Sequence, residues 1–210
     1  SEEKDALVDL KSSETAKVYS LIANYEAGST ITINGGTYNL DNAIDSHMYT
    51  GGDEGIIVNG GNFYLGNVGT GDNGKPWIFN ALGQNANNVV VNGGTFNADV
   101  NHQYWANEVY VPETLALQNN GDGTWTVVNA VANGEEIATS TGAKPRNVGY
   151  ASLADAVKFV KANGTVTVTA VHETTTTAVV EKDMTIDFAN LAITGDIYPV
   201  VRIQNNATVT

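Results

Sequence analysis

The sequence predicts an all-β fold organised as a solenoid, and a repeated bend motif is the main reason. Asn-Gly-Gly occurs three times in the 210-residue chain, at 34–36, 59–61 and 92–94. Each copy follows a run of β-branched residues. After each copy comes one polar residue and then an aromatic residue. The equivalent asparagines lie 25 and then 33 residues apart, and periods of about 20–50 residues are typical of stacked repeats.

The residues around each motif explain why the chain should bend without leaving its sheet. Ile31-Thr-Ile33 alternates and is β-branched, which favours a strand, and we expect the following glycine pair to adopt a positive φ. Asn-Gly also begins many β-hairpins, but the residues after each bend do not provide a strand that pairs back. In-register stacking predicts two ladders, one of Asn34, Asn59 and Asn92, and one of Tyr38, Phe63 and Phe96 in the core.

The similarity between copies extends upstream of the bend. Residues 21–36 align with residues 79–94, and a short strand precedes each segment, at 18–22 and at 77–79. The additional residues of the third copy fall around the Gly-, Asn- and Asp-rich stretch 66–75. Insertions on one face of a solenoid are where such proteins commonly carry function.

The order of motifs predicts two units joined by a linker. The first, 1–129, contains the three repeats and a C-terminal hairpin cap that turns at 119–123, and Ala6–Leu10 is expected to cover its open end. Residues 130–147 read as a linker or irregular crossover. The second unit, 148–210, opens with a helix at 152–163 and continues as strands, with Ser152 as N-cap and Asp155 completing a capping box.

These motifs resemble the right-handed, single-stranded parallel β-helix of the pectate-lyase-like superfamily. Within it, the chain is most similar to non-catalytic, adhesin-like surface proteins of gut bacteria. The resemblance implies a hairpin cap on the first β-helix unit and a short helix that opens a second. It carries over no catalytic residue, because the clustered carboxylates and basic clamp of the superfamily's enzymes have no counterpart here. Residues 1–112 contain only four basic side chains, Lys4, Lys11, Lys17 and Lys75.

Composition narrows the function classes. The formal net charge of −13 disfavours binding to nucleic acid and to anionic lipid. Cysteine is absent, which excludes disulfides and thiol chemistry, and there is no apolar run long enough to span a membrane. The polar start carries no signal peptide, so we interpret the chain as mature or trimmed and expect an extracellular or bacterial cell-surface location.

Three groups of residues are candidate ligand-binding positions. Asp45, His47, Asp53 and Glu54 fall in an acidic loop of the second repeat, where carboxylates can serve acid–base chemistry or bind Ca²⁺, although a solvated acidic loop is the interpretation that we favour. Asp72 and Lys75 share the insertion, and Trp77, Tyr104 and Trp105 are candidates for sugar stacking or for core packing. We expect no catalytic set, no metal site and no cofactor.

The leading hypothesis is therefore a secreted or cell-surface module that binds a host or microbial glycan or a surface protein. A polysaccharide lyase or glycoside hydrolase and a passive stalk segment are the alternatives. Residues 200–210 read like residues 80–91 and stop where the next bend is due. The exposed strand edge leaves three alternatives: the native chain continues, a second copy covers the edge, or the tail frays, and we favour continuation.

Overall fold

The protein is predominantly β, as predicted, with one helix among the residues that the structure describes. The structure, a computed structural model, describes residues 7–10, 18–51, 54–69, 76–81, 88–101, 110–137 and 145–210. Its strands pair in both parallel and antiparallel fashion. Contacts divide the chain into two units, one of residues 1–111 and 119–127, the other of residues 112–118 and 128–210.

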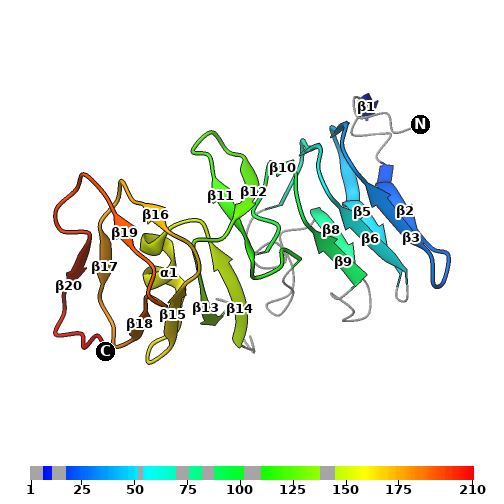
Figure 1. Cartoon of the computed structure of the whole chain (residues 1–210). Coiled ribbons are helices and arrows are strands. Elements are labelled where there is room, and N and C mark those ends of the chain that lie inside the picture. Colours follow the sequence, from blue (N-terminus) through cyan, green and yellow to red (C-terminus); the bar gives the residue numbers. More distant parts are fainter. Residues whose placement is uncertain are drawn as a thin grey trace. The chain divides into compact units, whose positions relative to one another are not determined.

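The first unit repeats one three-strand pattern. Its strands are β1 (Leu7–Leu10), β2 (Val18–Asn24), β3 (Thr30–Ile33), β4 (Thr37–Leu40), β5 (Ala43–Thr50), β6 (Gly55–Val58), β7 (Asn62–Leu65), β8 (Trp77–Ala81), β9 (Val89–Val91), β10 (Thr95–Phe96) and β12 (Trp125–Asn129). Each of the repeats 18–40, 43–65 and 77–96 contributes one strand to each of three parallel ladders. Two of them are β2-β5-β8 and β3-β6-β9 (Figure 1). The third is β4-β7-β10. Strand β1 extends the third ladder in parallel with β4.

The aromatic ladder predicted from the repeats is confirmed. The rings of Tyr38 and Phe63 stack with centroids 5.0 Å apart and 4° between their planes, and Phe63 and Phe96 stack at 5.0 Å and 11°. Phe63 and Phe96 are buried. The spacing matches the distance of about 4.8 Å between neighbouring strands, so the three rings occupy equivalent places in successive repeats.

The asparagine ladder forms on the outside of the same bends. Asn59 donates a hydrogen bond from Nδ2 to Oδ1 of Asn34 at 2.9 Å, and Asn92 donates likewise to Asn59 at 3.0 Å. The side-chain amides of two further asparagines also hold neighbouring parts of the repeats in register. Asn67 bonds both backbone groups of Ala43, and Asn97 bonds both backbone groups of Leu65. These side chains tie each repeat to the one before it.

The structure corrects the expected role of the first glycine in each motif. The positive φ belongs to the second glycine, with φ of 107° at Gly36, 119° at Gly61 and 114° at Gly94. Gly60 and Gly93, which we expected to share it, have no positive φ. A Cβ on Gly60 would instead lie 3.1 Å from the carbonyl oxygen of Asn34 in the previous repeat. Gly60 and Gly93 are therefore required by close backbone approach, and the second glycine of each motif by backbone angle.

The second unit combines antiparallel and parallel pairs around one helix. Its elements are β11 (Leu115–Asn119), β13 (Ala132–Ile137), β14 (Pro145–Tyr150), α1 (Leu153–Phe159), β15 (Thr165–Val168), β16 (His172–Glu173), β17 (Ala178–Val180), β18 (Thr185–Asp187), β19 (Ile193–Thr194) and β20 (Val201–Ile203). Strand β13 pairs antiparallel with β14 and β15. The three strands β15, β16 and β17 pair in parallel with β18, β19 and β20, respectively.

The segment 130–147 differs from the linker that we expected. Strand β13 and the start of β14 occupy much of it, and they pair from Ala132 with Tyr150 to Ile137 with Pro145. A buried ion pair accounts for this order, since Arg146 contacts the carboxylate of Glu136 through Nε at 3.0 Å and Nη2 at 2.8 Å. Glycine, serine and proline suggested an irregular connection, but this charge pair and its strand register outweigh local propensity.

Helix α1 begins as predicted and ends earlier. Ser152 accepts a hydrogen bond from the backbone N–H of Asp155 at 3.0 Å and donates one to its carboxylate at 2.7 Å. We expected the helix to reach residue 163, but Val160 leaves the helical conformation and bridges Glu136 of β13. Pairing with the sheet therefore ends the helix. Within the described residues, no helix is long and apolar enough to cross a membrane.

Candidate functional site

We expected Asp45, His47 and Glu54 to lie in a solvated acidic loop, but all three side chains are buried. Asp45 and His47 lie in strand β5, with exposed fractions of 2% and 0%. Asp45 Oδ2 accepts hydrogen bonds from Asn80 Nδ2 at 2.7 Å and from Ser46 Oγ at 3.2 Å. Strand β5 is the central strand of its sheet, with β2 and β8 paired along its two edges, and all of its residues except Ile44 are buried. Polar residues at these positions hid the strand from sequence reasoning, since a buried strand usually reads as apolar.

His47 is a core residue and not the surface side chain that we expected. Its Nε2 lies 3.0 Å from the carbonyl oxygen of Tyr38, and its ring meets Phe63 edge to face at 5.8 Å. Burial lowers the pKa of the imidazole to about 4, against a smaller upward effect of the Tyr38 hydrogen bond. The neutral form of His47 is therefore the one that packs against the aromatic ladder.

The remaining candidate residues either are buried or lie outside the described residues. Trp77 is buried in β8, and Tyr110, which is also buried, packs against Phe79 with ring centroids 5.3 Å apart. Trp77 thus belongs to the core and not to an exposed sugar-stacking platform. Glu54 is buried as well. The other predicted positions lie outside the described residues, namely Asp53, Asp72, Lys75, Tyr104 and Trp105.

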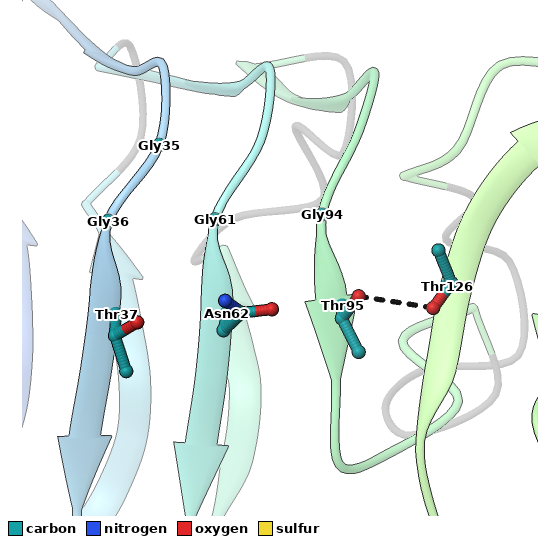
Figure 2. A pocket seen from close by; sticks show the side chains of 8 residues that line it. All are labelled: Gly35, Gly36, Thr37, Gly61, Asn62, Gly94, Thr95 and Thr126. Carbon is teal, nitrogen blue, oxygen red and sulfur yellow. Dashed lines mark hydrogen bonds between the residues drawn. The ribbon is translucent and has the colours of Figure 1, made fainter. Parts of the chain in front are cut away.

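An open groove of about 510 Å³ runs along the Asn-Gly-Gly bends. Gly35, Gly36, Gly61 and Gly94 lie at the bends, and Thr37, Asn62, Thr95 and Thr126 line it further along the strands (Figure 2). Sequence reasoning assigned the bends a structural role only. The signal that it missed is the polar residue directly after each glycine pair, at 37, 62 and 95.

The second glycine of each bend lies against the aromatic ladder, which leaves no room for a Cβ at Gly61 or Gly94. A Cβ on Gly61 would come within 3.1 Å of the Phe63 ring, and one on Gly94 within 3.3 Å of the Phe96 ring. The exposed backbone is nevertheless satisfied, because Gly36, Gly61 and Gly94 accept hydrogen bonds from the N–H groups of Asn62, Thr95 and Val127. The glycines therefore open the groove without leaving a buried polar group unpaired.

The polar side chains form one row across the strands. Thr37 faces Asn62, Asn62 faces Thr95 in parallel register, and Thr95 faces Thr126 in the antiparallel pair of β10 and β12. Thr95 and Thr126 share a hydrogen bond of 3.1 Å, drawn as the dashed line in Figure 2. Within the part of the chain that the structure describes, the side chains of Thr37 and Asn62 make no hydrogen bond. They are available to a ligand as donors and acceptors.

The eight residues that line the groove carry no titratable side chain, so none of them is a general acid or general base of the usual kinds. No group of three or more His, Asp or Glu side chains in the described residues is placed to hold a metal ion.

No protein-family model matches this chain, and neither a curated protein nor a solved structure matches it. The resemblance to the pectate-lyase-like superfamily therefore remains a prediction.

Proposed function

We propose that this chain is a secreted or cell-surface module that binds a neutral glycan along the groove of the Asn-Gly-Gly bends. In this proposal the first unit is a right-handed, single-stranded parallel β-helix, and its role is non-catalytic. The observation that carries the proposal is the row of Thr37, Asn62 and Thr95 beside a floor of glycines. Hydroxyl and amide groups repeated about every 4.8 Å suit an extended, hydroxyl-rich ligand.

Charge favours a neutral ligand over a polyanion. The groove lining is uncharged, while the whole chain carries a formal net charge of −13. An acidic polysaccharide would be repelled by that field. A neutral glycan exchanges hydrogen bonds with water for hydrogen bonds with the row, and its flat faces contact the glycine backbone.

A glycan array probed with the labelled chain tests the proposal, followed by calorimetric titration of the glycans retained. Thr37→Val and Asn62→Ala are expected to lower affinity about tenfold each, the loss expected for one or two hydrogen bonds of roughly 0.5–1.5 kcal/mol. Thr32→Val is the matched control, because Thr32 is exposed on β3 and does not line the groove.

Two results would overturn this proposal. Retention of no neutral glycan would leave a stalk role or recognition of a surface protein. Release of reducing or unsaturated ends from an incubated polysaccharide, lost in the Asn62→Ala variant, would replace the binding role with an enzymatic one.

A further inference from the structure

Three tyrosine rings gather at the ladder of β2 and β5, away from the residues that line the groove. The ring centroids of Tyr25 and Tyr49 are 5.0 Å apart with 37° between the planes, and those of Tyr19 and Tyr49 are 6.3 Å apart at 74°. Tyr49 is nearly buried at 7% exposed, whereas Tyr19 and Tyr25 are 51% and 65% exposed. Two large ring surfaces are thus open to solvent around a fixed third ring.

A buried carboxylate lies beside these rings. Glu54 is 7% exposed, and its Oε2 is buried with no hydrogen-bond partner. The atoms converge at Gly51, because the point where its Cβ would lie is 3.5 Å from Glu54 Oε2, 3.7 Å from Tyr49 Cε1 and 3.8 Å from Tyr25 Cδ1. Burying a carboxylate oxygen without a hydrogen-bond partner is costly, and a cation bound beside it would supply that partner.

The electrostatics of the cluster point the same way. Burial raises the pKa of the Tyr49 phenol, and Tyr25, Tyr19, Asp45 and Glu54 add to this in decreasing order. Burial is the main cause, and the carboxylates of Asp45 and Glu54 contribute least. The protein's net charge of −13 also favours the approach of a cation.

We propose that Tyr19, Tyr25, Tyr49 and Glu54 form a binding site for an organic ammonium group, of the kind carried by choline or a methylated amine. The negative faces of aromatic rings attract such cations, and quaternary ammonium ligands are typically bound in cages of several rings. The carboxylate beneath them adds attraction that water screens little, because it is buried. This site does not depend on the glycan groove.

Calorimetric titration of the full chain with tetramethylammonium and with choline tests the site. Saturable binding of both is expected, and the uncharged tert-butyl analogue of choline should bind at least tenfold more weakly, because it has the same shape without the charge. Equal binding of the analogue, or no saturable binding of either cation, would overturn the proposal.

Variants at single residues then locate the site. Tyr25→Ala and Glu54→Gln should each weaken choline binding about tenfold, corresponding to roughly 1.4 kcal/mol per factor of ten, whereas Tyr25→Phe keeps the ring and should keep the affinity. Tyr64→Ala is the control, since Tyr64 is a half-exposed tyrosine on β7 outside the cluster. Thermal melts check that each variant is folded, and Glu54→Gln in particular.

A neutral sugar is the competing occupant of the tyrosine cluster. If methyl glycosides bind there instead, with losses for Tyr25→Phe as well as Tyr25→Ala, the phenol hydroxyl is the recognised group and the ammonium proposal is wrong. Because Thr37→Val alters the groove alone, its effect on glycan binding and the effect of Tyr25→Ala on choline binding test the two proposals separately.

Discussion

Gly93 packs so closely against the carbonyl oxygen of Asn59 in the preceding repeat that a Cβ has no room there. Gly60 meets Asn34 in the same way, with 3.1 Å between the position of a Cβ and the carbonyl oxygen. The side chains of the same asparagines bond along the ladder. Backbone contact and amide ladder together fix how far apart successive bends lie.

This contact predicts a large cost for the smallest substitution. Gly93→Ala should lower the free energy of unfolding by about 2 kcal/mol, because the backbone of one repeat must move away from the next. Gly51→Ala is the matched control, since its Cβ would meet its neighbours at ordinary distances of 3.5 Å or more. Urea unfolding of both variants gives the comparison, and equal stability of the two would contradict the close approach.

The aromatic ladder predicts a cavity effect at its middle ring. Phe63 is stacked on both sides, by Tyr38 and by Phe96. Phe63→Ala should cost about 3–5 kcal/mol, the usual range for removing a buried aromatic side chain. Tyr64→Ala, on the neighbouring and exposed position, should cost far less. A loss below about 1 kcal/mol for Phe63→Ala in denaturant melts would mean that the ring is not buried.

Burial of His47 predicts a specific dependence of stability on pH. The folded-state pKa of His47 is about 4, below the ordinary histidine value of 6.5. Between these values the unfolded chain binds a proton that the folded chain does not, so stability falls as the pH falls through this window and levels off below it. The full contribution is about 3 kcal/mol, at roughly 1.36 kcal/mol for each pH unit.

The variant His47→Gln isolates this contribution. Urea titrations of both proteins between about pH 4 and pH 8 should give a difference in stability that changes with pH across the window. A difference that stays constant would mean that the histidine titrates normally in the folded protein. Carboxylates titrate in both proteins, so their effects largely cancel in the comparison.

The buried pair of Glu136 and Arg146 predicts a strong asymmetry between single and double substitution. Arg146→Met removes the cation from a carboxylate that is 3% exposed, and should cost about 3–5 kcal/mol. Replacing both residues, as Glu136→Leu with Arg146→Met, should restore much of that loss because no buried charge remains. Chemical denaturation measures both. A double variant as unstable as the single one would contradict this view of the pair.

The spacing of the repeats was the feature of the sequence that predicted the structure most reliably. The ladder of Tyr38, Phe63 and Phe96 follows from spacing alone, because equivalent residues of stacked repeats must lie one above another. The N-cap at Ser152 was equally predictable, since its partner Asp155 is local. Contacts between residues far apart in the sequence could not be predicted. The buried state of Asp45 depends on Asn80, 35 residues away, and no local pattern signals that contact.

Tertiary contacts also explain the elements that the sequence misplaced. Local propensity extended α1 to residue 163, but Val160 bridges Glu136 of β13 and the helix ends at Phe159. The three-tyrosine cluster was missed because Tyr19, Tyr25 and Tyr49 lie in different repeats or bends, and only the β2–β5 register brings them together. From residue types alone, we had named Trp77 and Trp105 as aromatic side chains that could bind a ligand.

In-register stacking of the three repeats is tested most directly by engineered cysteine pairs, because the chain has no cysteine of its own. Asn34 and Asn59 are exposed neighbours in the ladder, so Asn34→Cys with Asn59→Cys should form a disulfide rapidly under mild oxidation. Asn34→Cys with Asn92→Cys places the thiols two repeats apart, about 9–10 Å, and should leave both thiols free. Mass spectrometry with thiol counting distinguishes these results. Failure of the first pair to close, or rapid closure of the second, would contradict the stacking.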